Sequence, residues 1–462
     1  MFRQSYSKCM SLLLCVAIGF SSFAPIYAQE AQDQNSDQTS LRDYIQQGGN
    51  NMSALDKDIL KKEVELIKLN AEFFSHYTKG SKWKKRRMNF YDAAAGTVAN
   101  VGDIILMSQF YRYYKNPGEG LAHKGRLQCG ALIVLVAYLT LGGMYAGEGA
   151  YDLINDYKGK RKGFDAKTVY NRALTIKTDL DKLFAQRDAQ CQSASSDAKA
   201  AMVAEGNVLK DIRDLALIEF SKIYVDSRKK RVARDLTTLG TLAVCATGAF
   251  PGAYNVMRGV KQVNLKKVGG GGVGFLVSGS ILTAAPVLIH GGAAIQGKVS
   301  NDKVKKNLIE SRSKTVAALK DDVKTLGQLS VQAGEKNQKP YEMLAQLLNQ
   351  REEFLQKLAV QQKREVIESF VSYLAKGGPQ IAWGTMLTRA GYRHRQEPVQ
   401  AFRGIAQAAT VNEVSWATWM LDTFQREVRD EIKNHKNGKK PAQSLPFGVE
   451  NANLVELENI VR

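Results

Sequence analysis

The sequence predicts an all-α protein with helical membrane hairpins and long amphipathic helices outside the membrane. Only nine prolines occur in 462 residues, so long windows can stay helical without a break. Although 24% of the chain is charged, three long runs lack full charges: 127–147, 236–257 and 268–297. Since about 20 apolar residues cross the hydrocarbon core as a helix, each run is long enough to span it. A fourth run, 93–111, is marginal because it contains Asp103.

The first 28 residues have the pattern of a bacterial-type secretory signal. A short basic start precedes an apolar run at 10–23, and cleavage is expected after Ala28. The alternative is an uncleaved N-terminal anchor. Residues 29–55 are rich in Gln, Asn, Ser and Asp, and they have too little apolar surface to offset the entropy lost on ordering. We therefore expect a flexible linker after the signal peptide.

Residues 84–151 align without a gap with residues 228–295, at a shift of 144 positions. The alignment pairs two basic clusters, and it also pairs Gly130 with Gly274 and Gly147 with Gly291. Chance similarity between glycine-rich apolar segments is the alternative. The alignment predicts a duplicated unit in which an apolar hairpin lies between charged helices.

The duplication predicts the domain organisation of the chain. The expected parts are helical unit A at 56–198 with its hairpin at about 91–147, helical unit B at 199–335 with its hairpin at about 236–297, a C-terminal helical region at 336–435 and a tail at 436–462. One apolar stripe follows the helix predicted at 341–376, which Gly377, Gly378 and Pro379 are expected to end. Such a stripe is typical of coiled coils, so we expect a protein partner or a second copy to dock on these C-terminal helices.

Small residues are predicted to pack the membrane helices. Gly270, Gly274 and Ser278 recur at every fourth position, and such a face lets two backbones approach closely in lipid. With the repeat, the predicted packing residues are Gly130, Gly147, Gly270, Gly274, Ser278 and Gly291. The alternative is a buried helical hairpin in a soluble bundle. Residues 269–274 also match a dinucleotide-binding glycine pattern, but no buried strand precedes them and no acidic residue follows at the required distance, so no cofactor is expected.

The net charge of +20 favours an anionic partner. Two basic clusters directly precede apolar runs, and Trp83 beside the first would suit an interfacial anchor. The predicted headgroup-binding residues are Trp83, Lys84, Lys85, Arg86, Arg87, Arg228, Lys229, Lys230 and Arg231. We expect an anionic lipid or another envelope polyanion as partner, and no nucleic acid. Solvated helix ends are the alternative.

Two polar residues, Asp103 and His290, are candidate functional groups inside the membrane. No catalytic motif and no metal-ligand spacing occurs in the sequence, so neither an enzyme nor a metal site is expected. The leading hypothesis is a scaffold or interaction protein in the inner membrane with helices in the periplasm. A transport or pore component is the first alternative, and a soluble periplasmic helical bundle is the second.

Overall fold

The computed structural model describes residues 54–78, 81–117, 124–193, 196–262, 264–309, 315–333, 339–393, parts of 399–432, 447 and 452–461. The described residues form helices and no strand, which confirms the all-α prediction. The expected signal peptide and most of the expected linker lie outside the described residues, as do the side chains of Trp83 and Lys85.

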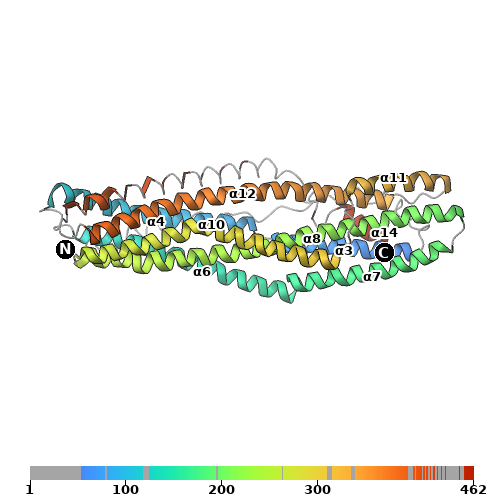
Figure 1. Ribbon diagram of the computed structural model, residues 1–462, viewed down its shortest axis with the longest axis horizontal. Helices are drawn as coiled ribbons and strands as arrows, with labels where there is room; N and C mark the ends of the chain where they lie inside the picture. The colour runs from blue at the N-terminus through green and yellow to red at the C-terminus, as the bar shows by residue number, and fades with distance from the viewer. Residues whose placement is uncertain are drawn as a thin grey trace, which may run out of the picture.

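The helices run back and forth along one elongated bundle (Figure 1). In chain order they are α3 (Ala54–Thr78), α4 (Ser81–Lys115), α6 (Lys124–Arg161), α7 (Ala166–Gln192), α8 (Ser196–Thr247), the π-helix η2 (Gly248–Tyr254), α9 (Asn255–Gln262), α10 (Leu265–Leu308), α11 (Val316–Ala333), α12 (Lys339–Tyr392) and α14 (Ala452–Val461). Three helices, which contain α6, α8 and α10, are long and apolar enough to cross a membrane. They carry the three uncharged runs found in the sequence.

Local sequence signals set the corner between α6 and α7. Gly163 adopts a φ of 77°, a left-handed conformation that favours glycine. The Asp165 carboxylate then accepts hydrogen bonds from the backbone N–H groups of Lys167 and Thr168, both at 3.2 Å, and caps the N-terminus of α7. A glycine stop followed by an aspartate cap therefore separates two long helices.

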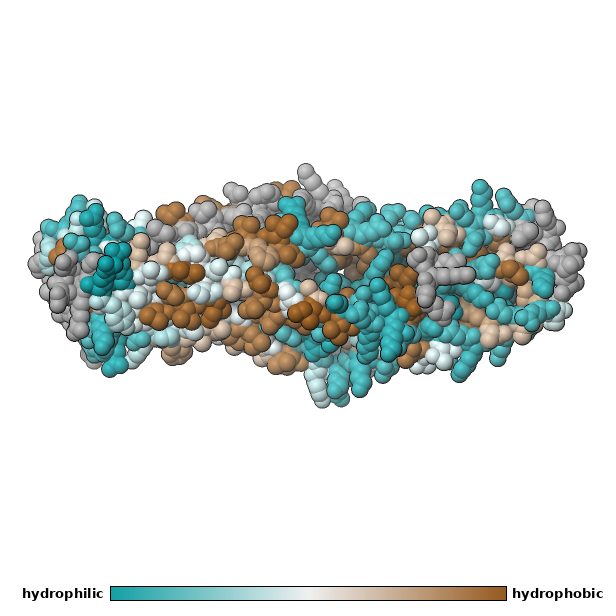
Figure 2. Space-filling model, in the orientation of Figure 1, coloured by the Kyte–Doolittle hydropathy of each residue, from teal (hydrophilic) through white to brown (hydrophobic). Residues whose placement is uncertain are grey.

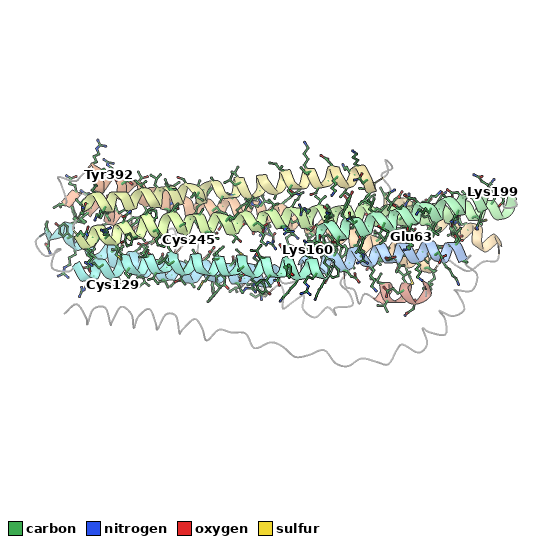
Figure 3. All side chains as sticks on the ribbon, turned by 90° about the horizontal axis from the view of Figure 1, so that it is seen from below. Glu63, Cys129, Lys160, Lys199, Cys245 and Tyr392 are labelled. Atoms are coloured by element: carbon green, nitrogen blue, oxygen red, sulfur yellow. The ribbon has the colours of Figure 1, made fainter. Side chains whose placement is uncertain are left out.

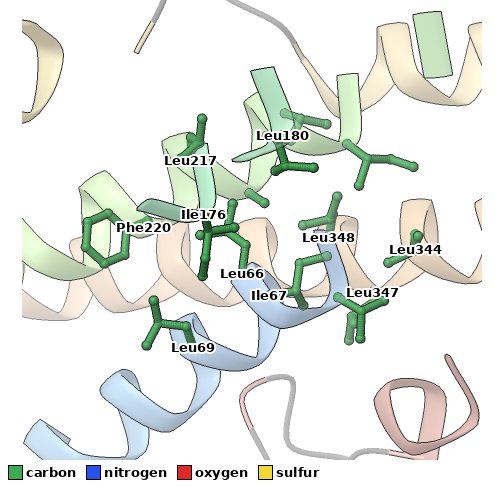
Figure 4. Packing of buried hydrophobic residues seen from close by; sticks show 14 of the residues in the cluster. Leu66, Ile67, Leu69, Ile176, Leu180, Leu217, Phe220, Leu344, Leu347 and Leu348 are labelled. Carbon is green, nitrogen blue, oxygen red and sulfur yellow. The ribbon is translucent and has the colours of Figure 1, made fainter. Parts of the chain in front are cut away.

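One half of the bundle, which we call the polar half, buries its apolar residues inside. It comprises α3, α7, α11, α14 and the adjoining parts of α8, α10 and α12. Leu66 and Ile67 of α3 meet Leu180, Phe220 and Leu348 in its core (Figure 4). Buried side chains from helices far apart in sequence thus hold this half together.

The other half, which we call the apolar half, has a separate core. It comprises α4, α6, η2, α9 and the remaining parts of α8, α10 and α12, with described residues from 402–432. Its core includes Phe110, Val134, Phe275 and Trp383. We call its far end the tip: there α4 ends, α6 begins, α9 meets α10 and α12 ends (Figure 1).

The C-terminal region departs from its expected place outside the hairpins. Helix α12 does not end at Gly377–Pro379 but continues to Tyr392, and α10 packs along it in the apolar half. Described residues beyond α12 return along α4, since Thr410 contacts Met107 and Thr97 contacts Met420. The final helix, α14, belongs to the core of the polar half again. The apolar half therefore contains a third hairpin that the sequence did not indicate.

The polar half buries ionisable groups. The Arg351 side chain is fully buried, and it donates to the Ile67 carbonyl and the Glu219 carboxylate, each at 3.1 Å. Glu63 is also fully buried, and neither of its carboxylate oxygens has a hydrogen-bond partner among the described residues. Burial raises the pKa of Glu63 well above its ordinary value of 4.5. Folded protein therefore keeps Glu63 protonated at pH values where the unfolded chain ionises it.

We predict that Glu63→Gln raises the stability of the protein at pH 7. In the wild type, stability should fall as the pH rises from about 4.5 toward the folded pKa, because only the unfolded state releases the proton. Glutamine has the shape of the protonated acid and cannot ionise, so we expect a gain of at least about 1 kcal/mol and a flatter profile. Thermal unfolding between pH 5 and 8 measures this.

Glu219→Gln is the matched control, because it leaves the buried Arg351 guanidinium without its carboxylate. It should lower the melting temperature. An unchanged pH profile in Glu63→Gln would contradict the protonated state of Glu63.

Candidate functional site

Large apolar side chains are exposed almost entirely on the apolar half. Fewer are exposed beside the polar core: Val455 on α14, Val203 on α8 and, close to the boundary, Tyr157 on α6 and Val360 on α12. Along α10 the exposed apolar residues include Val287 (60%), Leu288 (62%) and Ile295 (69%). Figure 2 shows this surface as a brown region between hydrophilic residues at the tip and the hydrophilic polar half. Side chains that would be buried in a water-soluble bundle here form the outer surface.

The length of this surface matches a lipid bilayer. On α10 the residues between Lys267 and Lys298 carry no full charge, a distance of about 46 Å at 1.5 Å per residue. A bilayer is about 40–45 Å thick with its headgroups. The charged residues that bound the run therefore have the separation of two headgroup layers.

Glycines pack α10 against α12 at backbone distance. A Cβ added to Gly384 would collide with the Leu276 backbone nitrogen, and one added to Gly272 would lie 2.7 Å from the Gly384 carbonyl oxygen. The same holds for Gly279, whose added Cβ would lie 3.0 Å from the Gly377 oxygen. Spacings of seven on both helices keep these glycines on one face of two antiparallel helices. We call this contact the glycine seam.

The predicted packing residues differ in their surroundings. An added Cβ would lie 2.7 Å from the Gly102 oxygen at Gly130, and 2.5 Å from the Gly252 nitrogen at Gly274. Each of these two aligned glycines thus contacts the preceding helix of its own hairpin. Ser278 is fully buried. Three other predicted residues show no such close packing: Gly147 and Gly291 have nothing within 4 Å of an added Cβ, and Gly270 meets only the Tyr392 hydroxyl at 3.9 Å.

The partner of Gly274 is the π-helix η2. Pro251 has no N–H to donate to the Thr247 carbonyl, four residues before it. That Thr247 oxygen would lie 2.8 Å from a Cβ at Gly274. The carbonyl that lacks its regular hydrogen bond therefore lies directly against Gly274 of α10. The duplication itself stays a prediction.

Polar side chains connect three helices in the middle of the apolar half. The Gln380 amide nitrogen donates to the Ser278 hydroxyl at 2.7 Å and to the Tyr138 hydroxyl at 3.0 Å. These residues come from α12, α10 and α6. Because the Gln380 and Ser278 side chains are buried, these bonds favour one rotational setting of the three helices.

The two predicted intramembrane polar residues lie apart from each other. Asp103 is 4% exposed and borders a small cavity beside Phe275 and Trp383. The His290 ring stacks on Phe370 of α12, with ring centroids 5.7 Å apart. The structure therefore does not bring Asp103 and His290 into one site.

An ion pair inside the apolar half was missed by the sequence reasoning. The Lys376 amine lies 2.7 Å from one Asp92 oxygen, and the Tyr145 hydroxyl donates to the other at 2.9 Å. Lys376 adjoins Gly377, which packs against Gly279 near the middle of the uncharged run of α10. Local sequence patterns could not predict this pair, because the two residues are 284 positions apart.

The basic clusters predicted to bind headgroups form ion pairs within the chain. Arg87 contacts Glu148 at 2.6 Å, Arg231 contacts Asp156 at 3.0 Å and Lys230 contacts Asp226 at 3.0 Å. Lys84 pairs with Asp152, and Arg234, outside the predicted set, also pairs with Asp156 at 2.9 Å. We call these pairs the ion-pair collar, and they lie where the two halves meet. The positive charges of these paired residues are thus balanced by neighbouring carboxylates, whereas Arg228 and Lys229 of the predicted set form no ion pair among the described residues.

Comparison with known proteins gives no match, whether with protein-family models, curated sequences or solved structures.

We predict that Gly384→Ala destabilises the apolar half whereas Gly378→Ala does not. The first adds a methyl group against the α10 backbone, which should cost about 1–3 kcal/mol. Gly378 lies on the same helix with nothing within 4 Å of its added Cβ, and alanine there should gain up to about 1 kcal/mol of helix propensity. Thermal unfolding in detergent measures both, and equal behaviour of the two variants would argue against the glycine seam.

We predict that Asp92 and Lys376 are coupled. Asp92→Asn or Lys376→Met alone leaves a charge in the apolar half without its partner, which should destabilise the fold by about 3–5 kcal/mol. The double variant removes both charges and should recover most of this loss. A double-mutant cycle of unfolding free energies measures the coupling, and strictly additive effects would refute it.

Proposed function

We propose that this protein is a non-catalytic helical scaffold of the bacterial cell envelope. Its apolar half anchors it in the inner membrane, and its polar half stands in the periplasm as a surface for other proteins. The division of the chain into two halves with opposite surfaces supports this role. One half exposes apolar side chains to its surroundings, and the other covers a conventional apolar core with charged residues.

The concentration of exposed apolar residues on one half is the observation that carries the proposal. Hydrophobic side chains on the outside of α10 are stable in lipid, where they meet acyl chains. In water the same surface would favour aggregation. This argues against the soluble periplasmic bundle as the first choice.

A transport component is the second candidate, because ionisable and polar groups lie inside the apolar half. Asp103, the Asp92–Lys376 pair and Gln380 are all buried or nearly so. Such groups in membrane proteins often serve solute or proton pathways. Here the Asp92–Lys376 pair and Gln380 have partners on neighbouring helices, which supports a packing role. A scaffold tolerates loss of Asp103 and His290, whereas a transporter requires at least one of them.

We predict that the protein stays with membranes through alkaline carbonate washing and leaves only with detergent. The lipid-facing surface can be mapped with single cysteines. Leu288→Cys in the apolar half should be protected from a membrane-impermeant maleimide, because lipid covers that side chain. Val203→Cys in the polar half should react.

The two positions are matched controls, since both carry exposed aliphatic side chains, at 62% and 46%. Labelling is measured above the background of the unaltered chain. Release by osmotic shock, or equal labelling of Leu288→Cys and Val203→Cys in membranes, would overturn the anchoring role.

A further inference from the structure

The tip of the apolar half gathers basic residues from three separate parts of the chain. The segments 112–126, 258–267 and 389–403 each contain four lysines or arginines, and together they contain only Glu119 and Glu397 as acidic residues. The core of the apolar half joins their helices, because Leu127, Val260 and Ala390 belong to the same buried cluster. The end of α12 meets the start of α10 directly, where Gly391 packs on Gly269.

Several basic side chains at the tip are exposed and have no carboxylate partner among the described residues. Six of them form no ion pair with any acidic residue in the described part of the chain: Arg126, Arg258, Lys261, Lys266, Arg389 and Arg393. The ion-pair collar at the other boundary of the apolar surface is the opposite case. There Arg87, Lys230 and Arg231 each have a carboxylate within 3.0 Å.

Aromatic side chains surround the tip. Tyr111 and Tyr392 are each 52% exposed, and Tyr254 is 41% exposed. Tyrosines of this kind are enriched where a membrane protein passes from acyl chains into headgroups. The tip thus combines an aromatic belt with unpaired cations at the end of a surface that is one bilayer long.

We propose that the tip is a binding surface for anionic phospholipid headgroups in the leaflet that it reaches. This inference rests on the proposed membrane anchoring, and it identifies the tip as the part of the protein that selects the lipid. Phosphate groups accept hydrogen bonds from arginine and lysine. Cations at the membrane surface also gain from the negative potential of anionic lipids. The collar residues contribute little to this preference because their charges are already paired.

The test uses the full-length protein in nanodiscs of phosphatidylcholine alone or mixed with phosphatidylglycerol. The tip variant carries Lys261→Gln, Lys266→Gln, Arg389→Gln and Arg393→Gln. Native mass spectrometry of protein released from the mixed nanodiscs gives the ratio of retained phosphatidylglycerol to phosphatidylcholine. Thermal unfolding in phosphatidylcholine verifies that each variant is folded.

The control variant removes the same number of charges from the polar half, at the exposed residues Lys182, Lys199, Lys320 and Lys324. Figure 3 shows Lys199 at the opposite end of the molecule from Tyr392, which marks the tip. We expect the preference for phosphatidylglycerol to fall at least about tenfold in the tip variant, because four exposed cations no longer attract the anionic headgroups. The control should keep the wild-type preference.

Equal retention of the two lipids by the wild type would overturn the inference. So would an unchanged preference in the tip variant, or an equal loss in both variants, which would reflect net charge alone. A protein that inserts into both kinds of nanodisc without lipid preference contradicts this inference and leaves the membrane anchoring intact. Failure to insert at all contradicts the anchoring.

Discussion

The close contact between α10 and α12 is the constraint on which the apolar half depends. At the glycine seam, no side chain separates the two helices, so their backbones approach within the reach of a single methyl group. The contact holds α12 beside the uncharged run of α10, although the sequence of α12 contains both charged and apolar residues. It also sets the register of the two helices, which places Lys376 beside the middle of the uncharged run and the end of α12 at the tip. This contact therefore brings the last part of α12 into the apolar half.

Polar groups inside the apolar half are tolerated because they find partners across helices. A lysine or aspartate in a lipid environment is expensive when alone. The pairing of Lys376 with Asp92, and the bonds from the Gln380 amide nitrogen to Ser278 and Tyr138, join α4, α6, α10 and α12. The Gln380 amide oxygen has no hydrogen-bond partner among the described residues. Such directional contacts complement the glycine seam. The glycines allow the helices to approach, and the polar contacts select one rotational setting.

Charge is distributed unequally between the two ends of the apolar surface. Both ends are rich in lysine and arginine, so the sequence alone gives them the same character. In the folded chain the collar places carboxylates of α6 beside the basic residues of α4 and α8. The tip has no comparable carboxylates among its described residues. The difference lies in which acidic residues the helices bring close, because a salt bridge acts over only a few ångströms.

The sequence by itself determined the all-α class and the three long apolar helices. These features depend on local composition and on interactions within a few residues. It also indicated close packing at Gly130 and Gly274, because small residues leave a recognisable periodic pattern. Only the tertiary structure decided that Gly147 and Gly291 face open space, that α12 continues through Pro379, and that Asp92 meets Lys376. Each of these depends on which distant segment lies opposite, and neighbouring residues in the sequence carry no information about that.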